Sequence, residues 1–124
     1  MNYIGTIIKE SLQNTDVLNH IQILSTKVEP VTEKHKTPWL KKWTLHKIEI
    51  QEKDAETIAQ ELSKTLEKNY WYADYKNKEL HYIIFSNKIF KINRSSSEQY
   101  LEAKNYGLSL GIPEYQVDFS PGIK

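Results

Sequence analysis

The fold is decided by residues 70–93, which read YWYADYKNKELHYIIFSNKIFKIN. Aromatic and β-branched residues fill this stretch, and two short polar breaks divide it into three segments. Runs of this composition, separated by turn residues, are typical of antiparallel strands joined by hairpins. We therefore expect a three-stranded meander over residues 70–76, 80–86 and 88–93.

The first turn, at Asn77-Lys78, predicts which residues face each other on the first two strands. Counting outward from it places Asp74 opposite His81, on the outer face of the sheet. The other face then carries a continuous apolar set, which consists of Trp71, Ala73, Tyr75, Leu80, Tyr82 and Ile84. We expect this apolar face to be the core of the protein.

The second turn decides which residues of 88–93 join that face. A three-residue loop at 86–88 brings Phe90 and Ile92 onto it, whereas a two-residue loop brings Lys91 there instead. Burying an unpaired ammonium group is costly. The three-residue loop is therefore the prediction.

Two amphipathic helices are expected on either side of the meander in the chain. The first covers residues 54–68, because Asp54 is a suitable N-cap and apolar residues follow at every fourth position, namely Ile58, Leu62 and Leu66. The second covers residues 96–110. It begins with a capping box, Ser95 with Glu98, and ends at Leu110-Gly111-Ile112-Pro113, a typical helix stop.

The remaining segments add strands to the sheet. Residues 3–12, 21–31 and 44–51 have β-type composition, and residues 115–119 could add a last short strand. We predict a single α+β domain over residues 1–119 with a flexible tail at 120–124. Its antiparallel sheet has five to six strands, with both amphipathic helices on one face. The alternative is a ferredoxin-like core with extra strands.

Composition excludes several classes of site. The chain has 124 residues and no cysteine, which excludes disulfides, thiolate metal sites and a cysteine nucleophile. Its four histidines lack the i, i+4 spacing of a helical zinc pair, and its four glycines do not cluster into a phosphate-binding loop. We expect no metal and no cofactor. Without a signal peptide or a long apolar run, we expect a cytoplasmic protein that does not enter a membrane.

The charge is distributed unevenly. Residues 34–47, KHKTPWLKKWTLHK, hold five lysines, two tryptophans and no acid, and without these lysines 12 basic residues face 16 acidic ones. Lysines interleaved with aromatic residues can follow a phosphate backbone while bases stack on the indoles. We favour the other interpretation, in which the tryptophans anchor the core and the lysines form a solvated rim. The candidate binding residues here are Lys34, His35, Lys36, Trp39, Lys41, Lys42, Trp43 and Lys47.

The Asp74–His81 pair is the candidate for chemistry. A carboxylate beside an imidazole can orient it for general-base catalysis, although the sequence places no nucleophile beside it. A structural cross-strand pair is the favoured interpretation. The outer face of the meander is also apolar, with Tyr72 and Phe85 as candidate partner-binding residues. We expect the N-terminal strands, a second copy of the chain or a ligand to cover it.

Three segments, residues 37–46, 71–77 and 111–119, resemble those of a small family of uncharacterised prokaryotic proteins. The resemblance covers nearly the whole chain and implies a small one-domain protein, but no particular activity.

The function expected from these features is a non-catalytic binding or protein-interaction module, with a protein partner or a second copy of the chain. One alternative is a single-stranded nucleic-acid binder that uses residues 34–47. The other is a small hydrolase or transferase that uses His81 and Asp74.

Overall fold

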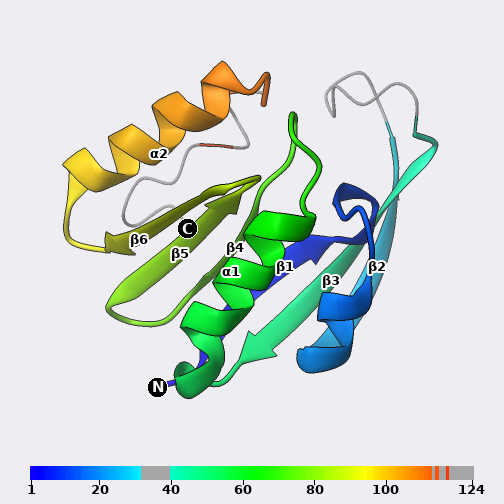
Figure 1. The fold of residues 1–124 in the computed structure, drawn as a ribbon, viewed down its shortest axis with the longest axis horizontal. Coiled ribbons are helices and arrows are strands. Elements are labelled where there is room, and N and C mark those ends of the chain that lie inside the picture. The colour runs from blue at the N-terminus through cyan, green and yellow to red at the C-terminus, as the bar shows by residue number, and fades with distance from the viewer. Residues whose placement is uncertain (32–39, 113, 115–116, 118–124) are drawn as a thin grey trace.

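The computed structural model describes residues 1–31, 40–112, 114 and 117 (Figure 1). Within them lie six strands, two α-helices and short 3₁₀ turns. The strands are β1 (Tyr3–Ile8), β2 (Gln22–Pro30), β3 (Lys42–Ile50), β4 (Ala73–Lys76), β5 (Leu80–Phe85) and β6 (Lys88–Asn93). The helices are α1 (Ala55–Thr65) and α2 (Ser97–Ser109), and the 3₁₀ turns are η1 (Lys9–Ser11), η2 (Asp16–His20) and η4 (Glu52–Asp54).

The strands form a single sheet in the order β2-β3-β1-β4-β5-β6. Each neighbouring pair is antiparallel, which confirms the predicted α+β class and six-stranded sheet. Because β1 lies between β3 and β4, helix α1 connects two strands that are not neighbours (Figure 1). A ferredoxin-like core would place β5 beside β3, whereas β3 pairs with β1 and β2, so the ferredoxin-like alternative is wrong. No helix in the described part of the chain is long and apolar enough to cross a membrane.

Strand β1 enters the middle of the sheet because Gly5 allows its backbone to approach β4 closely. Gly5 lies opposite Tyr75. A Cβ atom at position 5 would collide with the carbonyl oxygen of Asp74 and would lie 2.5 Å from the Cα of Tyr75. These are backbone atoms of a central strand, so they cannot move aside as the end of a side chain could.

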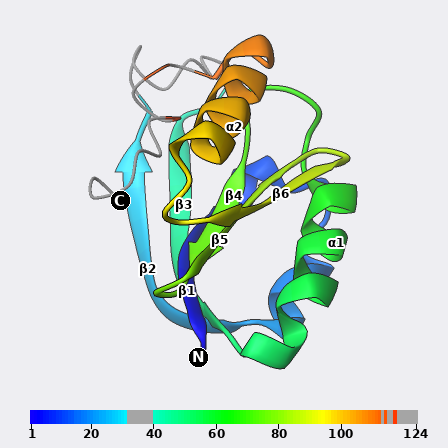
Figure 2. The ribbon, with the colours of Figure 1, turned by 90° about the vertical axis from the view of Figure 1, so that its left-hand side faces the viewer.

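The two helices cover opposite faces of the sheet, and each closes its own apolar core. In Figure 2, strands β5 and β6 run between α1 and α2. Helix α1 contributes to the larger core, with Ile7, Ile48, Ile58, Leu62, Tyr75, Tyr82 and Ile84 among its buried members. Helix α2 closes the smaller core, whose buried members are Ile83, Phe85, Ile92, Tyr100, Ala103, Ile112 and Val117. The prediction that both helices lie on one face of the sheet is therefore wrong.

The second turn explains why α2 has its own face. Phe85 pairs with Lys88, so the loop has two residues and not the predicted three. Asn87 closes it with a positive φ of 60°, a conformation that asparagine adopts more easily than most residues. Lys91 therefore lies opposite Tyr82 on the α1 face, yet its ammonium stays exposed and lies 5.7 Å from the centre of the Tyr82 ring. The burial cost assumed in the prediction does not arise, because β6 is an edge strand.

The first turn differs from the prediction by two residues of register, which preserves the faces. Tyr75 pairs with Tyr82, and Ala73 pairs with Ile84. Asn77 begins the turn, since its side-chain oxygen accepts hydrogen bonds from the amides of Glu79 and Leu80. An even shift leaves each side chain on its predicted side.

The ends of α2 agree with the predicted signals to within a residue. The N-cap is Ser96, which accepts a hydrogen bond from the amide of Gln99, so the cap lies one residue after the predicted Ser95. At the other end Gly111 has a φ of 86° and ends the helix as expected. The predicted strand at 115–119, apart from buried Val117, and the tail at 120–124 lie outside the described residues.

We expect Gly5→Ala to lower the free energy of unfolding by about 3 kcal/mol, because the new methyl group meets the backbone of β4. Urea denaturation followed by tryptophan fluorescence measures the change. Thr6→Ala, at the neighbouring exposed position, is the control and should cost about 1 kcal/mol or less. Equal losses in the two variants would contradict this account of β1.

Candidate functional site

Asp74 and His81 are hydrogen-bonded, as predicted, although they are not directly opposed. Asp74 pairs with Ile83 and His81 pairs with Lys76, which makes the two side chains diagonal neighbours on β4 and β5. The imidazole Nε2 of His81 lies 2.7 Å from the carboxylate Oδ2 of Asp74. The His81 side chain is fully buried, whereas the Asp74 side chain is 21% exposed.

Helix α2 completes this cluster with Tyr100. The hydroxyl of Tyr100 lies 3.1 Å from the Nδ1 atom of His81, and the two rings meet edge to face at 5.7 Å. Burial raises the pKa of Tyr100, and a hydrogen bond and the positive charge of Arg94 act in the opposite direction. Arg94 also donates a hydrogen bond of 2.6 Å to the carbonyl of Asn77, in the turn that joins the two strands.

The chemistry of these groups gives the hydrogen bonds a direction. A carboxylate only accepts, so Nε2 of His81 carries a proton and donates to Asp74. When the imidazole is neutral, Nδ1 is an acceptor, and the hydroxyl of Tyr100 donates to it. Arg94, which has donors only, bonds to the oxygen of Tyr100. The chain of donors therefore runs from the Arg94 cation to the Asp74 anion.

The His81 side chain is enclosed within the protein. A general base must reach the proton of its substrate. Both ring nitrogens of His81 are engaged within the protein, and no part of its side chain reaches solvent. The network instead joins α2 to the hairpin of β4 and β5, and it satisfies polar groups that would otherwise be buried unpaired.

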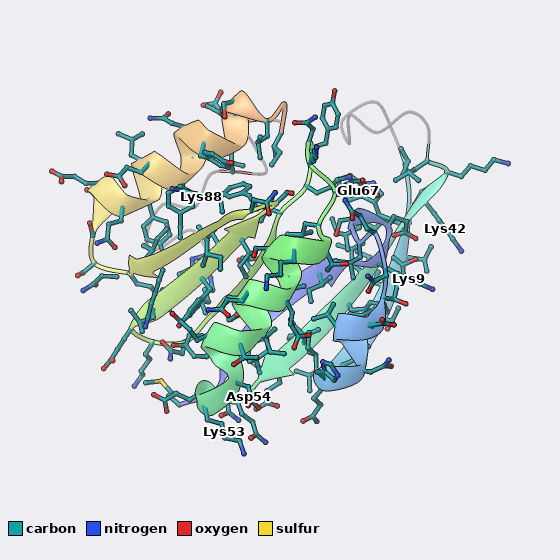
Figure 3. The ribbon with its side chains drawn as sticks, viewed as in Figure 1. Lys9, Lys42, Lys53, Asp54, Glu67 and Lys88 are labelled. Carbon is teal, nitrogen blue, oxygen red and sulfur yellow. The ribbon has the colours of Figure 1, made fainter. Side chains whose placement is uncertain are left out.

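The basic segment does not form an aromatic surface for nucleic acid in the part that the structure describes. Lys34, His35, Lys36 and Trp39 lie outside the described residues. Trp43 is only 5% exposed and packs on Trp71, with 5.3 Å between the ring centres. This contact agrees with the predicted core anchor. Lys41, Lys42 and Lys47 are exposed, and Figure 3 shows Lys42 toward the β2–β3 side of the molecule.

The predicted outer face of the meander is covered by α2. Phe85 is fully buried, and its ring meets those of Tyr72, Phe90 and Tyr106. Tyr72 is half-buried against the same core. This face was predicted to be covered by the N-terminal strands, a second copy of the chain or a ligand, and α2 covers it instead. In this arrangement α2 occupies the place where a partner was expected on Phe85.

A second polar contact, which the sequence did not suggest, ties η1 to β3. The carboxylate of Glu10 accepts hydrogen bonds from the amide and the hydroxyl of Thr44, at 2.6 and 2.8 Å. Burial acts to raise the pKa of Glu10, but these bonds and the charge of Lys42 outweigh it, so the pKa lies below the ordinary value. Close by on β3, burial and the charge of Lys9 lower the pKa of His46.

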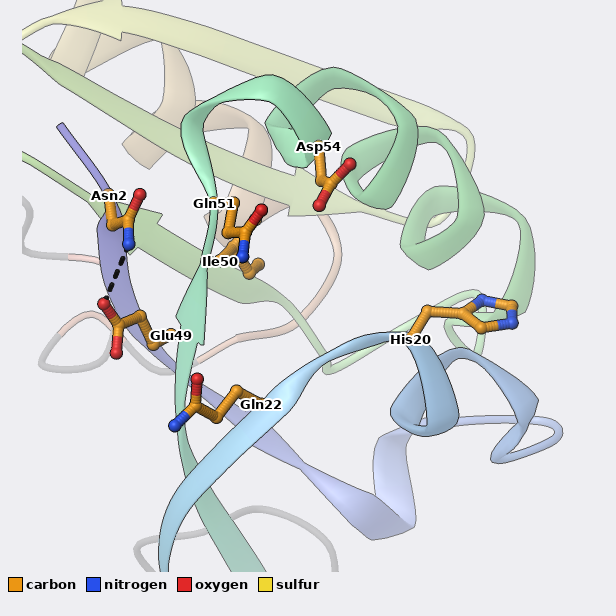
Figure 4. Close-up of a pocket in the computed structure, with 7 residues that line it drawn as sticks. All are labelled: Asn2, His20, Gln22, Glu49, Ile50, Gln51 and Asp54. Atoms are coloured by element: carbon orange, nitrogen blue, oxygen red, sulfur yellow. Dashed lines mark hydrogen bonds between the residues drawn. The ribbon is translucent and has the colours of Figure 1, made fainter.

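A small polar pocket opens at the other end of β3 (Figure 4). Its volume is about 120 Å³, and it is lined by Asn2, His20, Gln22, Glu49, Ile50, Gln51 and Asp54. Sites for small-molecule ligands usually enclose several hundred Å³ and are largely apolar, so this hollow does not resemble one. The described residues also include no group of three or more histidine, aspartate or glutamate side chains placed to hold a metal ion.

The edge strand β2 presents an exposed, partly apolar surface. It ends the sheet, and eight of its nine residues are exposed. Its large apolar side chains are among them: Ile23 is 39% exposed, Leu24 42% and Val28 54%. A strand is predicted over residues 21–31, but its place at the edge of the sheet is not. The available signal was Pro30, because proline within a sheet is largely confined to edge strands.

Comparison of the chain with protein-family models, curated proteins and solved structures found no match in any of the three. The resemblance to a small prokaryotic family therefore stays a prediction.

We expect Tyr100→Phe to lower the free energy of unfolding by about 1–2 kcal/mol, because the buried Nδ1 atom of His81 loses its donor. Urea denaturation provides the measurement. The control is Tyr106→Phe, since the half-buried ring of Tyr106 contributes mainly through its contacts with Phe85 and Phe90. If the two hydroxyls prove equally dispensable, the network does not hold α2 in place.

We expect Glu10→Gln to lower the free energy of unfolding by about 1 kcal/mol at pH 7. A carboxyl group whose pKa is lowered by folding stabilises the folded state above its unfolded-state pKa, near 4.5. This stabilisation is lost as the pH falls through the folded-state pKa. The gap between wild type and variant, measured by thermal unfolding from pH 7 to pH 3, should therefore narrow in acid. Glu102→Gln, at an exposed position on α2, should show no such trend. A constant gap would argue against the charge as its cause.

Proposed function

We propose that the protein is a non-catalytic interaction module that binds another polypeptide chain along the outer edge of β2. In this mode an extended segment of the partner adds a strand to the sheet. The observation that supports the proposal is the exposure of nearly all of a nine-residue edge strand. Natural proteins usually shorten or cover such edges, because the unpaired backbone groups recruit other strands.

The backbone groups available to a partner follow from the ladder between β2 and β3. The amide of Val31 donates to the carbonyl of Lys41, just beyond the ends of the two strands. Hydrogen-bonded pairs alternate along an antiparallel ladder, so Glu29 and Lys27 also direct their backbone groups toward β3. The intervening residues, Thr26 and Val28, direct theirs to the free edge.

Two further contacts agree with this assignment. The amide of Thr44, which is opposite Val28, turns away from β2 and donates to Glu10. Pro30 occupies an outward position, where the missing amide leaves no bond to β3 unmade. The free edge therefore offers the amides of Thr26 and Val28, together with the carbonyls of both residues and of Pro30.

Side chains beside this edge would limit the choice of partner. Thr26 lies opposite His46 of β3, and Val28 lies opposite Thr44. All four residues are on the α1 face. Lys27 and Glu29 share the other face. An incoming strand with an apolar residue beside Val28 and complementary charges beside Lys27 and Glu29 would fit both faces.

The arrangement around His81 favours a binding role over a catalytic one. The imidazole of His81 is the best general-base candidate in the sequence, and it is fully buried against Tyr100 of α2. The exposed groups of β2 include apolar side chains and the ammonium of Lys27, and its outer edge adds backbone amides and carbonyls; such groups suit recognition. The hydrolase alternative therefore has no exposed imidazole at this pair to act as its general base.

The test is site-specific photo-crosslinking in cells that produce the protein. A benzophenone amino acid replaces Val28 in one variant and Leu101, which is 55% exposed on α2, in the control. We expect covalent adducts from position 28 that are absent from position 101. Mass spectrometry of each adduct identifies the bound chain. An absence of adducts specific to position 28 would refute binding at this edge.

A further inference from the structure

We propose that the partner at this edge is a second copy of the same chain, paired antiparallel with β2 about a two-fold axis at Val28. This inference rests on the proposed function, since it names the strand that occupies the edge. The pairing would join two six-stranded sheets into one continuous sheet. A two-fold axis at Val28 brings complementary residues of the two copies into register.

Centred on Val28, the pairing uses the free backbone groups of β2. The amide of Val28 in each copy donates to the carbonyl of Val28 in the other. The amide of Thr26 donates to the carbonyl of Pro30 in the other copy. Pro30 lacks an amide, and this leaves only the carbonyl of Thr26 without a partner from the other strand.

The same register brings opposite charges together. Lys27 of each copy lies directly opposite Glu29 of the other, on the face away from Val28. Both residues direct their backbone groups toward β3, so they form the non-hydrogen-bonded type of pair, in which opposed side chains are closest. On the α1 face the two Val28 side chains, each 54% exposed in the single chain, cover one another.

Neighbouring two-fold registers are less favourable. An axis at Lys27 sets the two Lys27 ammonium groups directly opposite each other. An axis at Thr26 places Glu29 opposite Ile23 and extends the pairing over the irregularity between Ile23 and Ser25, where the regular spacing of backbone groups is lost. The register centred on Val28 keeps residues 26–30 clear of this irregularity.

The devices that usually protect an edge strand therefore leave one self-pairing open. Lysine, proline and a β-bulge on an edge are the common means of preventing strand addition. In β2 the charge of Lys27 and the irregularity between Ile23 and Ser25 disfavour the registers centred on Lys27 and Thr26, whereas Lys27 faces an acid and Pro30 is tolerated when the axis is at Val28. The overlap is short, so we expect dimerisation to depend on protein concentration.

Sedimentation velocity over a concentration series tests the charge pairing. We expect the wild type to shift from monomer to dimer as the concentration rises. Glu29→Lys and Lys27→Glu each set like charges opposite at both symmetric pairs, and each should raise the dissociation constant at least tenfold, roughly 1.4 kcal/mol. The double variant, Lys27→Glu with Glu29→Lys, restores opposite charges and should recover the dimer. Thermal unfolding of each variant verifies that the fold is intact.

A disulfide measures the position of the axis independently. The chain has no cysteine, so Val28→Cys introduces a lone thiol that lies beside its own copy across the axis. Directly opposed residues of antiparallel strands have a Cα separation compatible with a disulfide. We expect Val28→Cys to form a disulfide-linked dimer on mild oxidation. Ser25→Cys, on the same strand but far from its counterpart, should do so much more slowly.

The outcomes separate this inference from the proposed function. A monomer at every concentration, a double variant that fails to recover the dimer, or equal oxidation of the two cysteine variants would overturn the pairing at Val28. If adducts from position 28 then contain a different protein, the edge still binds a partner and only its identity is wrong. If no adduct forms there either, the proposed function fails as well.

Discussion

Five consecutive residues of β5, from His81 to Phe85, are buried, and in a strand this requires cover on both faces of the sheet. Successive side chains point to opposite sides, so Tyr82 and Ile84 enter the core beneath α1 while Ile83 and Phe85 enter the core beneath α2. Full burial of an isoleucine contributes about 1.5–3 kcal/mol, and each face gains such residues only if a helix covers it. The placement of both helices follows from this one strand.

The sequence predicts the existence of the elements better than their relationships. Turn residues, an apolar period of four and a glycine-proline stop are local signals, and the strands of the meander and both helices lie where these signals place them. The central position of β1 is not local. It depends on Gly5 meeting the backbone of β4 some 70 residues later, and no composition rule predicts that contact.

The error with the largest consequence was the predicted three-residue length of the second turn. It assigned Phe90 and Ile92 to the α1 face, whereas the two-residue loop at Asn87 turns both toward α2. The segment HYIIF held a contrary signal, since an unbroken apolar run is typical of a strand covered on both sides. Lys91 carries no burial cost on this face, because the face is not fully buried beside the edge strand β6.

The Asp74–His81 contact was predicted from a register that proved wrong, and the reason is physical. Diagonal neighbours on adjacent strands lie close enough for long side chains to meet, so a shift of two residues preserves the face and leaves the contact within reach. A hydrogen bond between a carboxylate and an imidazole therefore says little about function until burial is known. Here the His81 side chain is fully buried, and its Nδ1 atom lies 3.1 Å from the hydroxyl of Tyr100 on α2.

The two edges of the sheet differ in how far the described part of the chain covers them. Helix α2 packs against β6, and Ile92 and Phe90 of that strand contribute to the core beneath it. Strand β2 has no comparable helix in the described part of the chain, and its side chains gain little from the fold of a single copy. Nine residues of ordered strand carry a large cost in conformational entropy, and pairing with β3 on one side recovers only part of it. A partner on the outer edge would supply hydrogen bonds and apolar contacts that the isolated chain leaves to water, which is the physical argument for recognition at β2.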